Sequence, residues 1–331
     1  MRDLSFRTSK EKQKYFMTLS ILIFLSLVSI YGLLKYNNPV AVDSPSFLPV
    51  IRRRQNAIIA MLIAVTCHAF STLLFQTITN NRIITPSLLG FEAVYSTINT
   101  ATMYFLGINS FIAISGMTFY LSQIGIMVLI SLILFSTLLK KDRGVDFLLL
   151  VGIIMGQGLR SVSAFMRRLL SPSEFDILQA KLFASVNNSD SSYFLISAIL
   201  VLLVVGIIFS KSSKLNVIGL GSRASTNLGI DHKKTVIYSL IGISILMSVS
   251  TALIGPMNFF GFLVVSLTYE FANTYDHKYL FMMALFLAFF ILTTSYFIMN
   301  HIFNANGVVS ILIELVGGLY FIYIVFRKGK R

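Results

Sequence analysis

Charged residues are scarce in this chain of 331 residues. Asp, Glu, Lys and Arg together make up 12% of it, whereas an average soluble domain contains about 25%. Hydrophobic residues make up 56%, and the mean hydropathy is +0.80. So few charges cannot cover a surface that faces water on all sides. The composition therefore excludes an ordinary soluble protein and indicates a membrane protein.

Cysteine and the common catalytic motifs are also nearly absent. The single cysteine, Cys67, lies within an apolar run, so no disulfide framework is possible. The four histidines are scattered along the chain, at His68, His232, His277 and His301. The HExxH, GxSxG and GxxxxGK(S/T) patterns of metalloproteases, serine hydrolases and P-loop proteins do not occur. We therefore expect no enzymatic activity, no metal site and no cofactor, and any ATP-driven role requires a separate ATPase chain.

Long apolar segments recur along the whole sequence. A helix of about 20 apolar residues crosses the roughly 30 Å hydrocarbon core of a membrane, and most of the segments reach about that length. They cover residues 15–36, 57–78, 88–107, 116–139, 145–168, 191–210, 234–254, 256–272, 278–300 and 307–326. The pattern predicts an all-α, polytopic membrane protein with about ten transmembrane helices.

The basic residues predict the orientation of these helices. Ten spans place both termini on one side, and 19 of the 27 Lys and Arg residues fall on that side. Since basic loops stay in the cytoplasm, we expect both termini to be cytoplasmic. The predicted organisation is an N-terminal tail (1–14), one transmembrane permease domain (15–326) and a basic tail (327–331), with no cleavable signal peptide.

The longest predicted cytoplasmic connection, residues 211–234, is too polar to span a membrane. Within it, Leu220, Ala224 and Leu228 recur at every fourth position, which predicts a short amphipathic helix with Gly229 as a C-cap. Such a helix is either a docking element for a partner protein or part of a solvated loop.

Polar residues inside the fifth apolar segment are the first candidates for a translocation path. Gln157, Arg160, Ser161 and Ser163 all lie there, although polar groups are costly to bury in lipid. This part of the helix either packs against a neighbouring helix or lines a water-accessible path.

Two basic clusters fall on the predicted outer side, where the orientation rule does not require them. They consist of Arg52, Arg53 and Arg54, and of Arg167 and Arg168. Each cluster either anchors a span at the lipid headgroups or forms a docking surface for acidic residues of an external protein.

Over about residues 50–330 the chain resembles the FecCD-type permeases, which are the membrane subunits of ABC importers for iron-siderophores, haem and vitamin B12. The residues that match that family in order and without gaps are Arg54, Gln76, Asn81, Pro86, Leu88, Leu89 and Gly90. Arg82 replaces the first proline of the family pattern. The resemblance implies the type II ABC importer fold and a location in the bacterial cytoplasmic membrane.

The polar connection matches the family's coupling motif, which docks into a groove on the cytoplasmic ATPase. The resemblance therefore implies ATPase coupling for Leu220, Gly221, Arg223, Ala224, Leu228, Gly229 and Ile230. A later stretch departs from the family: Val265, Ser266 and Tyr269 stand where the family has Pro-His-x-x-Arg.

Residues 76–95 and 175–188 resemble one branch of the family, the second permease of catecholate-type importers for ferric siderophores such as anguibactin or petrobactin. In that branch the permease core is a heterodimer with a sister permease, served by an ATPase dimer and an extracytoplasmic substrate-binding protein. We therefore expect a permease that imports ferric siderophore by alternating access. A permease for haem or cobalamin and, more distantly, a polytopic membrane enzyme or sensor remain alternatives.

Overall fold

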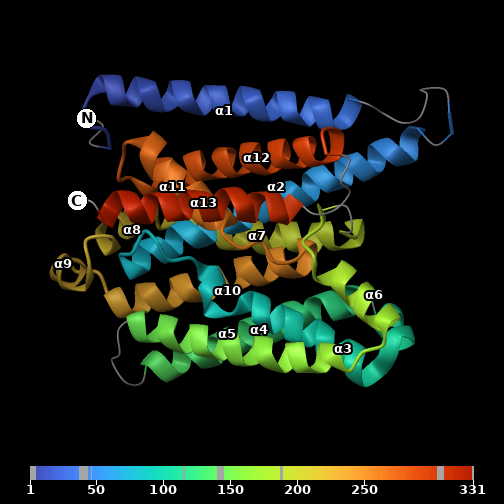
Figure 1. Cartoon of the computed structure of the whole chain (residues 1–331). Coiled ribbons are helices and arrows are strands. Elements are labelled where there is room, and N and C mark those ends of the chain that lie inside the picture. Colours follow the sequence, from blue (N-terminus) through green and yellow to red (C-terminus); the bar gives the residue numbers. More distant parts are fainter. Residues whose placement is uncertain are drawn as a thin grey trace.

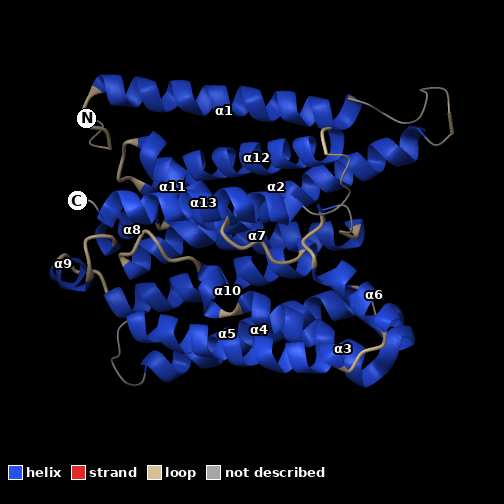
Figure 2. Ribbon diagram, in the orientation of Figure 1, coloured by secondary structure: helices blue, strands red, loops and turns tan. Residues whose placement is uncertain are grey.

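The apolar segments form long helices that lie side by side (Figures 1 and 2). The computed structural model describes residues 5–36, 44–45, 47–114, 116–139, 145–186, 189–303 and 309–329, and these residues contain no β-strand. The long helices are α1 (Ser9–Lys35), α2 (Phe47–Thr79), α3 (Phe91–Ala113), α4 (Met117–Leu139), α5 (Val145–Arg168), α7 (Phe194–Ser210), α10 (His232–Ile254), α11 (Phe260–Ala272), α12 (His277–His301) and α13 (Val309–Gly329). Every predicted segment overlaps one of them, so the all-α expectation is confirmed.

Length and hydropathy single out seven helices in the described part of the chain that could cross a membrane: α1, α2, α4, α5, α7, α10 and α12. Helix α11 and the stretch Val309–Tyr323 of α13 are apolar but shorter than a full span. Helix α3 is interrupted at Gly107, whose φ of 73° and ψ of 174° are not helical. The chain is thus a multi-pass membrane protein.

The described residues also form the short α-helices α6 (Pro172–Leu182), α8 (Ser212–Ile218) and α9 (Ser222–Asn227). Of these three helices, the sequence pattern described above predicts α9 alone. Helix α6 begins with a capping box, in which the Ser171 side chain accepts from the Glu174 amide and the Glu174 carboxylate accepts from the Ser171 amide.

Helix α2 is the centre of the packing. It contacts α10, α11 and α12, while α1 packs mainly against α12, and α5 packs against α3. Small side chains permit these close approaches, as is typical between membrane helices. A Cβ atom on Gly261 of α11 would lie only 3.1 Å from the Cβ atom of Thr72 in α2.

The two ends of the helix bundle differ in what they carry (Figure 1). One end, called here the α9 end, holds α8, α9, the start of α1 and the end of α13. The opposite end, called the α6 end, holds α6, the start of α2 and the end of α5. Of the two predicted tails, residues 1–4 and 330–331 lie outside the described part of the chain.

The turn between α2 and α3 brings the family-like residues against α5. Asn81 Oδ1 accepts a hydrogen bond from the Ile83 amide at 3.0 Å, and a 3₁₀ helix, η1 (Pro86–Leu89), follows. Gly90 has a φ of 88°, and a Cβ atom there would lie 3.3 Å from the Cα atom of Gly156 in α5. Glycine is therefore required at this turn for both its backbone conformation and its small size.

Candidate functional site: coupling helix, basic end and polar helix face

Helix α9 is held between two glycines with positive φ. Gly221, its N-cap, has a φ of 96° and a ψ of 169°, and Gly229 directly after its C-cap has a φ of 78°. Residues with side chains rarely adopt such angles. The Oγ atom of Ser225 lies 2.9 Å from Nδ1 of His232, the first residue of α10. This contact fixes α9 to the N-terminal end of α10.

The apolar residues in and beside this helix are only partly covered by the described part of the chain. Leu220 and Leu228 are 65% and 63% exposed, whereas Ala224 is half-buried and Ile230 packs against the core. Arg223 is exposed on the same short helix. Burying the two exposed leucines against another protein would remove apolar area from water.

The five arginines of the two basic clusters do not share one environment. The Nη1 atom of Arg54 donates hydrogen bonds to the carbonyl oxygens of Leu33, Leu34 and Tyr36 at 3.0 to 3.1 Å. Arg54 therefore binds the C-terminal carbonyl groups of α1, which is a favourable place for a cation. Its position is explained by the fold, without an external partner.

The remaining arginines divide between α2 and α5. The Nε atom of Arg167 donates to the Ser163 carbonyl oxygen at 3.3 Å, and its side chain is half-buried. Arg52, Arg53 and Arg168 are exposed. The α6 end thus offers three exposed guanidinium groups.

The polar residues of α5 lie on two different faces. Arg160 Nε donates to Gln157 Oε1 at 3.1 Å, Ser161 Oγ donates to the Gln157 carbonyl oxygen at 3.0 Å, and all three residues are exposed. Ser163 is buried, and its Oγ atom lies 2.8 Å from Thr97 Oγ1 in α3. Ser163 therefore joins two helices and does not belong to the exposed polar face.

Two carboxylates extend this polar face, and the sequence analysis did not identify them. Glu92 of α3 lines a cavity of about 260 Å³ with Arg160 and Asn258, and its Oε1 atom is buried without a hydrogen-bond partner among the described residues. Asn258 Nδ2 donates to Glu314 Oε1 of α13 at 3.1 Å. Both acids lie within predicted apolar segments. An ionisable residue inside an apolar run is itself a functional signal, and it was available in the sequence.

The sequence pattern of the FecCD transport family matches residues 16–327. The chain belongs to the FecCD transport family. It is 54% identical to the petrobactin import system permease protein FatC of Bacillus anthracis, over 98% of this chain and 92% of FatC. It is 22% identical to FatD of the same organism, also named a petrobactin import system permease protein, over 82% of this chain and 79% of FatD.

The fold is likewise that of an importer permease. A solved metal-chelate type ABC transporter in an inward-facing conformation superposes with a TM-score of 0.79, covering 94% of this chain and 99% of that chain at 17% identity. At this identity the likeness supports the fold alone. It agrees with the predicted type II importer architecture.

Two departures of this FecCD chain from the family pattern lie in contact. The guanidinium carbon of Arg82, which stands in place of a proline, is 4.4 Å from the ring centroid of Tyr269, which stands in place of an arginine. A cation over an aromatic ring is a favourable arrangement. The guanidinium group of Arg82 therefore lies over the ring of Tyr269.

Proposed function

We propose that this chain is a permease subunit of an ATP-driven importer that moves a ferric siderophore of the petrobactin class across the cytoplasmic membrane by alternating access. The observation that carries the proposal is the sequence identity to FatC. It is 54% over nearly the full length of both chains. The chain is a transport subunit, and a separate ATPase chain hydrolyses the ATP.

Helix α9 is the proposed contact with the ATPase. Its exposed leucines and the two positive-φ glycines that frame it support this role. Because α9 is fixed to α10, which packs along α2, a force applied at α9 reaches the centre of the bundle. With this role for α9, the α9 end of the bundle, which holds the start of α1 and the end of α13, faces the cytoplasm.

The second permease is proposed to be a different chain. Bacillus anthracis has two proteins named as petrobactin import permeases, and this chain is far more similar to FatC than to FatD. Within the described part of the chain, Gln157, Arg160 and Ser161 of α5 remain exposed. A FatD-like sister permease would complete the structure there.

The path and the outer docking surface follow from this arrangement. Gln157, Arg160, Ser161 and Glu92 are proposed to line the path, whereas Ser163 joins α5 to α3. At the α6 end, a set of exposed arginines is proposed to steer an acidic extracytoplasmic binding protein to the permease. That set is Arg52, Arg53 and Arg168, because Arg54 and Arg167 bind carbonyl groups of this chain. The siderophore already chelates the iron, so the permease requires neither an iron ligand nor a cofactor.

The coupling assignment is tested with the double variant Gly221→Pro and Ala224→Glu in the complete importer. Proline cannot adopt the positive φ of Gly221, and a carboxylate at position 224 places a charge on the docking helix. We expect normal membrane insertion, loss of ATPase association and loss of ferric petrobactin uptake.

The control variant is Gly206→Ala on α7, where an added Cβ atom meets nothing within 4 Å.

Uptake assays with ferric petrobactin, haem and cobalamin in the same cells distinguish the three cargo classes. Unchanged ATPase association in the double variant contradicts the role of α9. Uptake of haem or cobalamin, but not of ferric petrobactin, contradicts the cargo assignment.

A further inference from the structure

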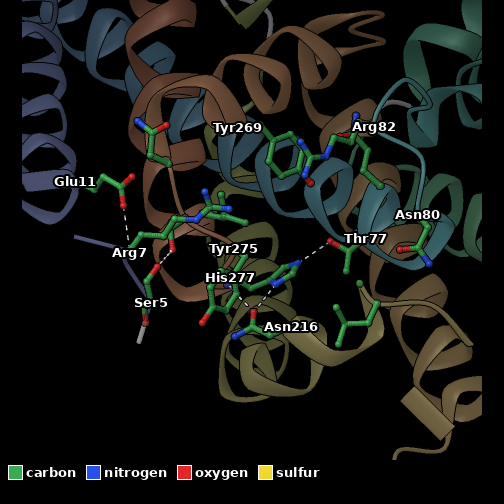
Figure 3. A pocket seen from close by; sticks show the side chains of 16 residues that line it. Ser5, Arg7, Glu11, Thr77, Asn80, Arg82, Asn216, Tyr269, Tyr275 and His277 are labelled. Atoms are coloured by element: carbon green, nitrogen blue, oxygen red, sulfur yellow. Dashed lines mark hydrogen bonds between the residues drawn. The ribbon is translucent and has the colours of Figure 1, made fainter. Parts of the chain in front are cut away.

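A polar cavity of about 660 Å³ opens at the α9 end of the bundle (Figure 3). Its walls come from the chain start before α1, the end of α2 with the turn after it, α8, and the connection from α11 to α12. Leu220, next to the coupling helix, also lines it. Nothing in the proposed import function requires a cavity at this place.

The side chain of Gln76 lines this cavity with its hydrogen-bonding groups unpaired among the described residues, which favours a bound ligand. Its side chain is only 2% exposed, and neither its amide nitrogen nor its amide oxygen has a hydrogen-bond partner among the described residues. An amide buried in this state lowers stability, and most buried amides in proteins are therefore paired. A ligand with polar oxygen atoms in the cavity would satisfy the donor of this side chain.

The charges that face the cavity favour an anion. Arg7 and Arg82 approach it from opposite sides, while Glu11 is the one carboxylate among its described lining residues (Figure 3). Glu11 is already engaged: its Oε2 atom accepts hydrogen bonds from the amides of Arg7 and Thr8 at 3.0 and 3.2 Å. The stack on Tyr269 orients the Arg82 guanidinium, whose N–H edges suit a phosphate or carboxylate group.

The part of the cavity wall formed by Asn216, His277 and Thr77 is held in place by hydrogen bonds among these residues. The Oδ1 atom of Asn216 accepts from the His277 amide at 2.9 Å and lies 2.6 Å from His277 Nδ1, and His277 Nε2 lies 2.7 Å from Thr77 Oγ1. These three residues tie α8, α12 and α2 together. The cavity is therefore formed before any ligand enters, which lowers the cost of binding.

We propose that this cavity is a binding site for a small molecule that carries a phosphate or carboxylate group, held by Arg7, Arg82 and the Gln76 amide. The site lies beside the coupling helix: a Cβ atom on Gly221 would be 3.9 Å from Asn80 Nδ2, and Asn80 lines the cavity. The same oxyanion chemistry occurs in free cytosolic anions and in anionic lipid headgroups.

The test measures the binding of inorganic phosphate to the full chain in nanodiscs of phosphatidylcholine, by equilibrium dialysis with labelled phosphate and by thermal unfolding. We expect saturable binding that Arg82→Ala or Arg7→Ala weakens about tenfold, because each loses a charge-assisted hydrogen bond. Lys278→Ala is the matched control, since it removes an exposed cation at the same end that does not line the cavity.

A second set of nanodiscs, made with phosphatidylglycerol, identifies the source of the anion. Stabilisation that requires phosphatidylglycerol and Arg82, without binding of free phosphate, assigns the site to a lipid headgroup. Saturable, Arg82-dependent phosphate binding in phosphatidylcholine assigns it to a free anion. If neither phosphate nor phosphatidylglycerol has an Arg82-dependent effect, the proposal is wrong.

Gln76→Leu separates a binding role from a structural one. Leucine removes the unpaired amide at similar size, so the ligand-free variant should unfold at the same temperature as the parent or higher. The shift in unfolding temperature caused by phosphate should be lost. A lower unfolding temperature together with unchanged phosphate binding would overturn the role of Gln76. None of these measurements involves siderophore transport, so their outcome is independent of the proposed cargo.

Discussion

Helices α2 and α5 are both long and apolar, and both carry polar side chains within their apolar part, but α2 buries far more of its residues than α5 does. In the most apolar window of α2, 78% of the residues are buried inside the chain, whereas the corresponding share for α5 is 28%. His68, Ser71 and Thr77 of α2 are buried. Gln157 and Arg160 of α5 are exposed.

Burial therefore distinguishes two kinds of polar residue. Some find hydrogen-bond partners inside the chain, and others face outward, where water or another molecule can contact them. Thr77 binds His277 within the chain, so the surrounding helices account for its polarity. Arg160 donates a hydrogen bond to Gln157 on its own helix and lines a cavity together with Glu92. An arginine exposed along a membrane helix is costly in lipid, so its position indicates contact with water or with a second protein.

The largest expected effect comes from disturbing the packing around α2. In Gly261→Ala the new Cβ atom clashes with the side chain of Thr72, and overpacking of this kind costs about 1–3 kcal/mol. We expect a clear fall in the unfolding temperature of the purified permease. Gly206→Ala on α7, which adds a methyl group in open space, should leave it unchanged. An equal response of the two variants would contradict the tight contact between α11 and α2.

For a substitution on the exposed face of α5 we expect the opposite result: the uptake rate falls and the unfolding temperature does not. Arg160→Leu removes an exposed charge, and we expect about a tenfold lower rate of siderophore uptake, equivalent to about 1.4 kcal/mol, with an unchanged unfolding temperature. Arg160→Lys keeps the charge and should restore part of the uptake. Normal uptake by Arg160→Leu would show that this face lies outside the path.

Much of the fold could be predicted from the sequence, because the long helices carry their own signal. Apolar runs of about 20 residues indicate membrane helices without any knowledge of their neighbours. Helix α8 is short and has no such run, so it was missed. Helix α6 was missed although Ser171 and Glu174 form a capping box that the spacing alone could have revealed.

The site was less predictable where a role depends on distant partners. The period of Leu220, Ala224 and Leu228 is local, and the structure contains the short helix it predicts. Arg54 was assigned to external docking, but its partners are carbonyl groups about 20 residues earlier in the chain. That contact exists only because the start of α2 packs beside the end of α1, which no local pattern reveals.

Ser163→Ala examines the two faces of α5 in a single helix. The variant loses the 2.8 Å contact with Thr97, and a buried hydrogen bond contributes about 0.5–1.5 kcal/mol. We expect a lower unfolding temperature with normal siderophore uptake. Ser161→Ala, on the exposed face, should leave the unfolding temperature unchanged. Impaired uptake in a stable Ser163→Ala protein would return Ser163 to the path.

The smallest effect is expected at the start of α10, the helix that packs along α2. The Oδ1 atom of Asp231 accepts a hydrogen bond from the Lys234 amide at 3.0 Å, and this bond lowers the pKa of the Asp231 carboxyl below its ordinary value. A carboxyl whose pKa is lower in the folded state stabilises the protein above its unfolded pKa of about 3.9. That contribution disappears as the pH falls through the folded-state value.

Asp231→Ala should therefore lower the unfolding temperature slightly at neutral pH, and the difference from the parent should shrink as the pH falls below about 4. Asp231→Asn keeps an oxygen acceptor for the Lys234 amide, so it should retain most of the stability and show little pH dependence. The comparison is made by thermal unfolding at a series of pH values. A difference between Asp231→Ala and the parent that stays constant with pH would mean that the charge of Asp231 does not contribute. The capping oxygen alone would then hold the start of α10 beside the coupling helix.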